Sequence, residues 1–217
     1  METSTVLLTG FEPFGGERTN PSWDAVIELA ARPRTGDHQL VVLQLPCVFD
    51  ASITALRAAV AEHAPDVVIC VGQAGGRDGI TPERIAVNLS DARVPDNAGN
   101  QPIDVPVVPD APAAYFTGLP VKACVARLEE AGIPASVSHT AGTFVCNHVF
   151  YGLMHLLATE LPHVRGGFVH VPFSPEQAEG KDAPSLPVST TADALDVIVR
   201  ASLEVSTDLA VSAGTLS

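Results

Sequence analysis

The sequence predicts an α/β fold, a three-layer α/β/α sandwich with a twisted, mixed and mostly parallel central sheet. Short apolar runs of strand length alternate along the chain with longer stretches of helical periodicity. The chain has 217 residues, of which 46% are hydrophobic, which suits one well-buried domain and is short for two. We therefore expect a single domain over residues 1–217.

The expected strands are six short apolar runs, at Thr5–Leu8, Gln39–Leu45, Val67–Val71, Ile85–Leu89, Ala135–Ser138 and Gly167–Val171. Each run is bounded by turn-forming or polar residues, which is typical of strands. All of them are much shorter than the roughly 20 apolar residues that a membrane-spanning helix needs. The sequence therefore predicts no membrane helix.

The expected helices have apolar residues at intervals of three and four, so each can cover one face of the sheet. They lie at Pro21–Ala31, Ala51–His63, Val121–Ala131, Cys146–Thr159 and Ala192–Leu209. Asn20 is a suitable N-cap for the first helix, because proline at the next position lacks an N–H that would be unpaired anyway. Asp50 is expected to cap the second helix in the same way.

The interval from Asp91 to Pro120 differs from the rest of the chain. Proline interrupts any regular ladder or helix there, at Pro95, Pro102, Pro106, Pro109, Pro112 and Pro120. We expect a long ordered excursion that lines an active site or forms a subunit contact, because loops of this length in compact domains are often functional. A flexible linker is the alternative.

Composition excludes some classes of function. The 12 basic and 25 acidic residues give a formal charge of −13, which disfavours nucleic acid because phosphate binding needs clustered Lys and Arg. The amino terminus lacks the basic region of a secretory signal peptide, so we expect a cytoplasmic protein. The four dispersed cysteines should remain thiols in that reducing compartment, at Cys47, Cys70, Cys124 and Cys146.

Cys146 is the first candidate for chemistry. It follows a glycine-containing turn, Ala141–Thr143, and begins an expected helix. The first turn of a helix has unpaired N–H groups and partial positive charge, which favour thiolate over thiol and can stabilise an oxyanion. A buried, inert thiol is the alternative, because free cysteine usually behaves as a small hydrophobe.

Two further residues can complete a nucleophilic site. His170 ends an expected buried strand, where a polar ring needs a partner, and it can orient or deprotonate a nucleophile. Glu83 precedes the strand at Ile85–Leu89 and can fix the tautomer of an imidazole. Spacing alone does not join them to Cys146, and Glu83 can equally be a solvated residue paired with Arg84.

The glycine-rich stretch Gly72–Gly76 and the histidines do not match familiar ligand motifs. The glycines follow an expected strand without the spacing of a phosphate loop, so they indicate either close approach of the backbone to a small ligand or a plain turn. His148 and His155 lie seven residues apart, whereas a helical zinc pair uses i and i+4. No metal site is expected.

Five segments together resemble bacterial pyroglutamyl peptidase I, also called pyrrolidone carboxyl peptidase. They occur in the same order and with similar spacing as in that family, from Val6 to about Gln177. The segments are Thr9–Gly16, Gly72–Gly76, Asp91–Asn97, Ser138–Asn147 and Gly167–Pro172. The resemblance is more specific than any single cysteine motif, and it disfavours a purely structural role for Cys146.

The resemblance implies a cysteine exopeptidase that removes N-terminal pyroglutamate from peptides without a metal or other cofactor. The nucleophile maps onto Cys146, the base onto His170 and the orienting carboxylate onto Glu83, with a thioester as intermediate. Arg93 matches an arginine implicated in stabilising the oxyanion; a loop salt bridge is its alternative. The family also implies a homotetramer. No membrane or nucleic-acid partner is implied.

The same resemblance places Phe11 and Phe14 around the lactam ring of the substrate. The residues that complete its surroundings are Gln73, Val94, Phe144 and Val145. Such a pocket is chemically reasonable, since pyroglutamate has no free α-amine and a carboxylate placed to bind one would be left unpaired. Backbone groups near Gln73 and Phe144 can pair with the lactam N–H and C=O. Such a site would discriminate against proline, which lacks the ring carbonyl.

The chain departs from the family pattern at His139, at Cys47 and in the segment Asp78–Gly79, which leaves pocket polarity and pH optimum open. Two other functions are compatible with the sequence. One is a non-catalytic binder of pyroglutamyl peptides or lactams, against which the presence of all three triad residues argues. The other is a nucleoside phosphorylase of related architecture, for which no phosphate motif is present.

Overall fold

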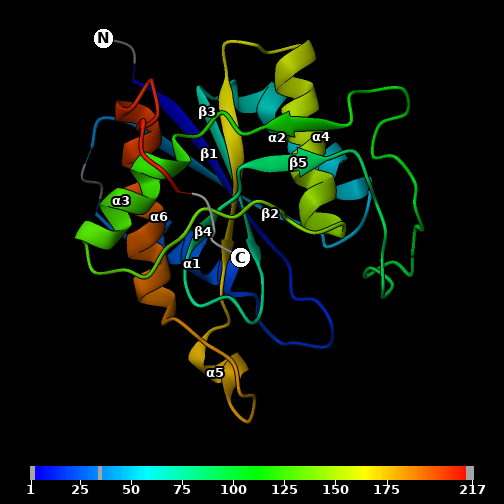
Figure 1. The fold of residues 1–217 in the computed structure, drawn as a ribbon, viewed down its shortest axis with the longest axis horizontal. Coiled ribbons are helices and arrows are strands. Elements are labelled where there is room, and N and C mark those ends of the chain that lie inside the picture. The colour runs from blue at the N-terminus through cyan, green and yellow to red at the C-terminus, as the bar shows by residue number, and fades with distance from the viewer. Residues whose placement is uncertain (1–2, 34–35, 214–217) are drawn as a thin grey trace.

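A computed structural model describes residues 3–33 and 36–213, so the amino-terminal stretch considered for a signal peptide is described from Thr3 onward, with Met1 and Glu2 outside it. The five-stranded central sheet has the order β2-β1-β3-β7-β4 (Figure 1). Its parallel strands are β1 (Thr5–Phe11), β2 (Gln39–Leu45), β3 (Val67–Gln73) and β7 (Arg165–Val171). The edge strand β4 (Thr81–Pro82) is antiparallel to β7.

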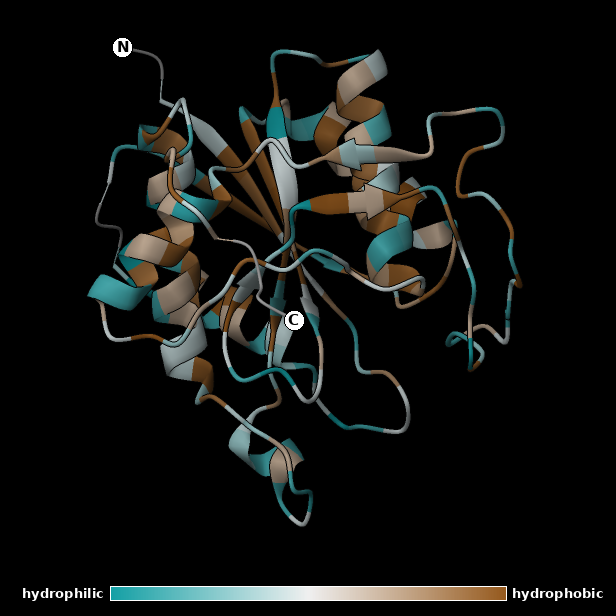
Figure 2. Cartoon of the chain, viewed as in Figure 1, coloured by the Kyte–Doolittle hydropathy of each residue, from teal (hydrophilic) through white to brown (hydrophobic). Residues whose placement is uncertain are grey.

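Helices cover both faces of this sheet. Two of them, α2 (Ala51–His63) and α4 (Val145–Thr159), pack on one face, and α1 (Pro21–Ala31), α3 (Val121–Glu130) and α6 (Val188–Glu204) pack on the other (Figure 1). The middle of the sheet is correspondingly apolar (Figure 2). The predicted three-layer α/β/α fold with a mixed, mostly parallel sheet is confirmed.

Alternation along the strands decides which side chains each helix layer receives. In β1, Leu7 packs toward α2 and α4, whereas Val6 and Leu8 pack toward α1 and α6. In β7, Phe168 belongs to the first set and Val169 to the second. Since side chains alternate with a period of two, His170 lies on the same face as Phe168 and α4.

The strand predictions are right for the parallel core and wrong in two places. Ala135–Ser138 forms only isolated bridges, to Ile80 and Glu83, because the partner strand β4 has two residues and cannot extend a ladder. The strand expected at Ile85–Leu89 is β5 (Ile85–Val87), which pairs with β6 (Ala114–Phe116) in a separate two-stranded sheet. Neither β4 nor β6 was predicted.

The helix predictions hold for α1 and α2, and are within a residue for α3 and α4. Asn20 caps α1, because its Oδ1 accepts from Ser22 N at 3.1 Å. The predicted helix Ala192–Leu209 is shifted: α6 follows Pro187 and ends at Glu204, and Asp208 beyond it accepts from the first-turn N–H of Ala123 in α3. The one-turn α5 (Pro175–Ala178) was not predicted.

The prediction that Asp50 caps α2 through its side chain is wrong. Asp50 has a positive φ of 56° and its carboxylate makes no capping hydrogen bond. Its backbone N–H instead donates to His148 Nε2 at 3.1 Å, which draws the residue toward α4. Among the described residues, no helix is both long and apolar enough to cross a membrane.

The excursion after Asp91 is held by hydrogen bonds along its course and includes β6. Asp91 N donates to Thr143 O at 2.9 Å, and Thr143 Oγ1 donates to Asp91 O at 2.8 Å. Further along, Ser90 and Val105 form an antiparallel bridge. The excursion therefore begins fastened to the loop that leads into α4, which does not suit a flexible linker.

Close packing of α4 on α2 gives a testable stability prediction. A Cβ at Gly152 would lie 2.4 Å from Ile53 Cδ1 and 2.8 Å from its Cγ1. Gly152→Ala should therefore lower the free energy of unfolding by about 1–3 kcal/mol, although alanine is the better helix former by about 1 kcal/mol. Urea unfolding measures the change.

The control is Ile53→Ala, which removes the clashing atoms. In the double variant the two costs should be clearly less than additive, because residues in contact couple. Strict additivity, or a more stable Gly152→Ala, would contradict this description of the α2–α4 contact.

Candidate active site

The carboxyl ends of the central strands bring residues from distant parts of the chain to one edge of the sheet. Phe11 ends β1, Gln73 ends β3 and His170 is the penultimate residue of β7. The helix α4, which carries Cys146 in its first turn, begins at the same edge. Since ligands of open α/β sheets bind outside this edge, the predicted site residues meet where the topology places a site.

Cys146 lies against the backbone of β3 beside the strand that carries His170. A Cβ at Gly72 would lie 2.8 Å from Cys146 Sγ, so the glycine makes room for the thiol. Gly72 pairs with His170 in the parallel register. The described residues show no hydrogen bond between the thiol and the imidazole, although such contacts often tighten only when substrate binds.

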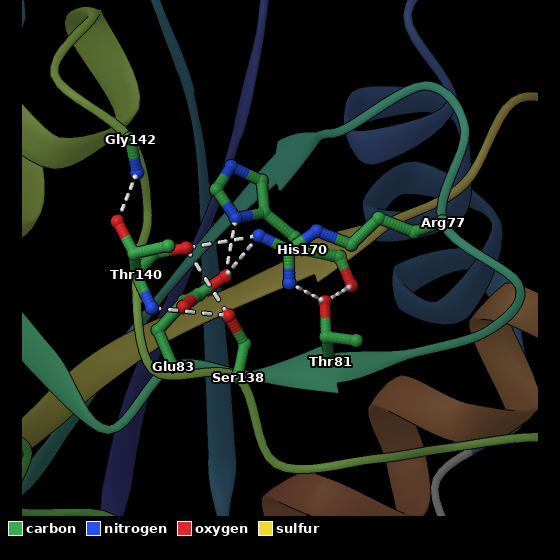
Figure 3. A network of polar contacts seen from close by, with 7 residues as sticks. All are labelled: Arg77, Thr81, Glu83, Ser138, Thr140, Gly142 and His170. Carbon is green, nitrogen blue, oxygen red and sulfur yellow. Dashed lines mark hydrogen bonds and ion pairs between the residues drawn. The ribbon is translucent and has the colours of Figure 1, made fainter. Parts of the chain in front are cut away.

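Glu83 is completely buried and contacts His170 directly. Its Oε1 lies 2.7 Å from His170 Nδ1 (Figure 3). The backbone fixes this approach, because β4 runs antiparallel to β7 and Glu83 N donates to Phe168 O at 2.9 Å. With Nδ1 donating to the carboxylate, the other ring nitrogen, Nε2, can accept a proton.

Arg77 also contacts this carboxylate and was not predicted as a site residue. Its Nη2 lies 3.0 Å from Glu83 Oε1, and its Nη1 donates to Thr81 Oγ1 at 2.8 Å. Nη2 also donates to Thr140 O at 3.0 Å (Figure 3). In the sequence, Arg77 is a single arginine that follows a glycine-rich turn, and no local pattern marks it as a site residue.

Burial dominates the acid–base properties of the site. Desolvation lowers the pKa of His170; Glu83 opposes this effect and Arg77 adds to it. Desolvation raises the pKa of Cys146, Cys47 and Glu83 raise it further, and Arg77 opposes them. Both shifts favour the neutral thiol and the neutral imidazole in the resting site.

Burial opposes the stabilisation of a thiolate that is expected from the helix start. The first turn of α4 has no side-chain cap, so its N–H groups remain available, and the helix charge does favour an anion there. Desolvation acts in the opposite direction at the partly buried Cys146, and at the buried Cys47 and Cys70 burial raises the pKa to about 12.

A small cavity opens beside the thiol. Its volume is about 130 Å³, well below the roughly 300–1,000 Å³ of sites for drug-sized ligands, and it suits a single small ring. The predicted residues that line it are Phe11, Phe14, Gln73, Phe144 and Cys146. Two lining residues, Asn20 and Cys47, were not predicted to bind substrate.

Aromatic contacts stiffen the cavity walls. The rings of Phe14 and Phe144 have centroids 5.1 Å apart, and Phe49 meets Phe144 edge to face at 5.3 Å. On the sheet side, Phe11 lies 6.3 Å from Phe168, whose ring is 4.9 Å from His170. Packed rings at these separations hold one another in place, so the cavity is largely preformed.

Glu12 joins three loops around the cavity through one carboxylate oxygen. Its Oε1 accepts from Cys47 N at 2.9 Å and from Asn97 Nδ2 at 2.8 Å. Asn97 Nδ2 also donates to Pro13 O at 2.9 Å. The loop after β1, the loop after β2 and the excursion are thus tied together at the rim.

Gln73 is oriented from behind by α5. Gln177 Nε2 donates to Gln73 Oε1 at 3.2 Å and to Thr19 O at 3.1 Å. A capping box with Ser174 fixes Gln177 in turn. Within the described residues, Gln73 Nε2 has no hydrogen bond, so this group can donate to a ligand in the cavity.

Three predicted residues do not line the cavity. Val145, the first residue of α4, is fully buried in the core. Arg93 is exposed and Val94 is 48% exposed, on the excursion just after the point where Asp91 is bonded to Thr143. Their roles stay predictions from the resemblance. His139, one of the family departures, is also exposed.

The two histidines of α4 have other partners. His148 Nδ1 lies 3.0 Å from Ser90 Oγ, and its ring packs edge to face on Phe49. His155 Nδ1 lies 2.9 Å from Tyr115 Oη. The two rings therefore support the fold around α4 and do not converge on a common ligand.

Comparisons with known proteins agree with the fold and with the resemblance. Residues 4–205 match the family model described as pyroglutamyl peptidase. The pyrrolidone-carboxylate peptidase of Streptomyces coelicolor is 61% identical over 196 residues, which is 90% of each chain. Pyrrolidone-carboxylate peptidase 1 of Photorhabdus laumondii is 53% identical over 216 residues, 97% of this chain and 98% of its own.

Solved structures are similar over nearly the whole chain. Pyroglutamyl peptidase I from Bacillus amyloliquefaciens superposes with a TM-score of 0.94 at 50% identity, over 97% of this chain and 100% of its own. A mutant pyrrolidone carboxyl peptidase from Pyrococcus furiosus gives a TM-score of 0.88 at 42% identity, over 92% and 98%.

The electrostatics of the site predict how Cys146 ionises. A thiol that is kept as thiolate ionises between about pH 3.5 and 7.5, whereas burial should keep Cys146 protonated over that range. Thiolate absorbance of the native protein, minus that of Cys146→Ser, should therefore stay flat there. A thiolate step within that range, removed by the substitution, would contradict the neutral resting pair.

Proposed function

The chain belongs to the pyroglutamyl peptidase family of cysteine peptidases, and from this membership we propose that it removes N-terminal pyroglutamate from peptides through Cys146, His170 and Glu83. The observation that carries the proposal is the buried 2.7 Å contact between Glu83 and His170, on the same sheet face as Cys146. The thiol also opens onto a cavity that suits one small ring.

The first step is attack of Cys146 Sγ on the pyroglutamyl carbonyl carbon. Because thiol and imidazole are both neutral at rest, the S–H proton passes to His170 Nε2 as the C–S bond forms. The carbonyl π electrons move onto oxygen. Glu83 holds the ring in the required tautomer and stabilises the imidazolium that results.

The oxyanion has donors at the start of α4. N–H groups in the uncapped first turn, that of Cys146 among them, can bind developing negative charge. We assign Arg93 as an additional cation from the resemblance. In support, Arg93 has no ion pair within the described residues and follows Asp91, which is fastened to Thr143 beside Phe144.

The intermediate then collapses to a thioester. The peptide amine leaves with the proton held by His170, and the C–N bond breaks. Water enters, gives a proton to His170 Nε2 and attacks the thioester carbonyl. The C–S bond breaks, His170 returns its proton to Cys146 Sγ and pyroglutamate leaves, and no metal or cofactor is needed for any of these steps.

Specificity is proposed to come from the cavity. Phe11, Phe14 and Phe144 contact the apolar faces of the lactam ring. The amide of Gln73, oriented by Gln177, and neighbouring backbone groups pair with the lactam N–H and C=O. A site built to pair these groups rejects a proline ring, which leaves them unsatisfied. Val94 and Val145 complete the surroundings only by resemblance.

For assembly, we propose the homotetramer that the resemblance implies. Ile103 on the excursion is 69% exposed and Phe116 on β6 is 71% exposed, and a contact between copies that covered these side chains would remove apolar surface from water. Cytoplasmic residence stays a prediction from the sequence.

The proposed nucleophile is tested with a pyroglutamyl-aminomethylcoumarin substrate under reducing conditions. Cys146→Ser should lower kcat by at least about 1,000-fold, because a serine in this site is a far weaker nucleophile. Iodoacetamide should abolish wild-type activity, and a metal chelator should leave it unchanged.

The matched control is Cys124→Ser, which changes a buried thiol in α3 outside the site and should keep wild-type turnover. Near-normal turnover by folded Cys146→Ser would sink the assignment. A wild-type protein that binds pyroglutamyl peptides without cleaving them would favour the non-catalytic binder instead.

A further inference from the structure

The Arg77 guanidinium joins three parts of the site that are separate in sequence. It contacts the carboxylate of Glu83 at 3.0 Å, the hydroxyl of Thr81 at 2.8 Å and the backbone carbonyl of Thr140 at 3.0 Å (Figure 3). Its side chain is only 23% exposed, so these contacts are partly shielded from water. This geometry is specific to a planar group with several N–H donors.

Charge is the first reason to assign Arg77 a role. Glu83 has no exposed surface, and its second oxygen, Oε2, has no hydrogen-bond partner among the described residues. Both His170 and Arg77 approach Oε1. A buried carboxylate facing only a neutral imidazole would be strongly disfavoured, whereas arginine supplies a permanent positive charge.

Placement of the nucleophile is the second reason. Thr140 lies in a turn in which Ser138 Oγ donates to Thr140 O at 3.1 Å and Gly142 N donates to Thr140 Oγ1 at 3.1 Å. Gly142 has a φ of +77°, which glycine adopts without strain. Four residues after this glycine comes Cys146, so the turn held by Arg77 delivers the chain into the first turn of α4.

We propose that Arg77 is a positioning residue that pairs with the buried Glu83 carboxylate beside His170 and fastens the Ser138–Gly142 turn that leads to the nucleophile. The inference rests on the proposed function for its meaning in catalysis. Arg77 touches neither substrate nor thiol in this assignment. It acts through the carboxylate and through the turn.

Removal of the Arg77 charge should shift the pH dependence of the site in one definite direction. Arg77 from the β3–β4 loop and Glu83 are the charged groups that act on His170. The same two groups, with Cys70 from β3 and Cys47 from the loop after β2, act on Cys146 in α4. Arg77 lowers the pKa of His170, so without Arg77 the imidazole should bind a proton at higher pH. As the pH falls, the active form, carboxylate with neutral imidazole, should then be lost at a higher pH than in the wild type.

The test compares Arg77→Met, Arg77→Lys and the control Arg57→Met. Arg57 pairs with Glu160 far from the site and should give wild-type values. In Arg77→Met we expect kcat to fall by about 10- to 100-fold with little change in KM. The acidic limb of its kcat/KM profile should move to higher pH. Arg77→Lys should keep the limb near the wild-type position and lose part of the rate, because one ammonium cannot make all three contacts.

Iodoacetamide labelling of Cys146 as a function of pH gives a second readout that needs no turnover. In Arg77→Met, the acidic inflection of the labelling rate should shift upward as well. If the wild type cleaves no pyroglutamyl amide, the proposed function fails while this labelling shift still decides the role of Arg77.

Three results would overturn the proposal: an unshifted acidic limb in folded Arg77→Met, superimposable labelling profiles, or a change confined to KM. If Arg77→Met does not fold, Arg77→Lys decides. A wild-type rate in that variant would show that the three contacts have no role in catalysis.

Discussion

The buried carboxylate of Glu83 is the constraint around which this site is built. A carboxylate with no exposed surface must be paired, because the cost of an isolated buried charge is large. Glu83 is paired by His170 on one side and Arg77 on the other, both at the same oxygen. The short antiparallel strand β4 brings it there, at the edge of an otherwise parallel sheet.

The consequences of that pairing extend to the nucleophile. The carboxylate orients the imidazole through Nδ1, which leaves Nε2 toward the thiol side of the sheet edge. Arg77, which supplies positive charge beside the carboxylate, also donates a hydrogen bond to the turn before α4. Burial favours the neutral forms of the thiol and the imidazole over an ion pair between them. In the proposed mechanism, charge separates only as the C–S bond forms.

The sequence could predict the parallel strands and most helices, because their apolar periodicity is set by the faces they bury. The sequence singles out Cys146, His170 and Glu83 as candidates, because each lies at the end or start of an element and matches a family motif. Arg77 was missed because a long side chain crosses from one loop to another, which no local pattern records. Asp50 was misassigned because tertiary contact with His148 competes with the local cap, and Ala135–Ser138 because its partner strand is too short for a ladder.

In the proposed mechanism, Cys146 carries the pyroglutamyl group during turnover. Acid quenching of the wild-type protein during turnover of a pyroglutamyl amide, followed by proteolysis and mass spectrometry, measures it directly. We predict that the peptide containing Cys146 gains the mass of one pyroglutamyl group, removable by hydroxylamine as a thioester should be. Rapid turnover with no acyl group on Cys146, under conditions in which thioester hydrolysis limits the rate, would contradict the account.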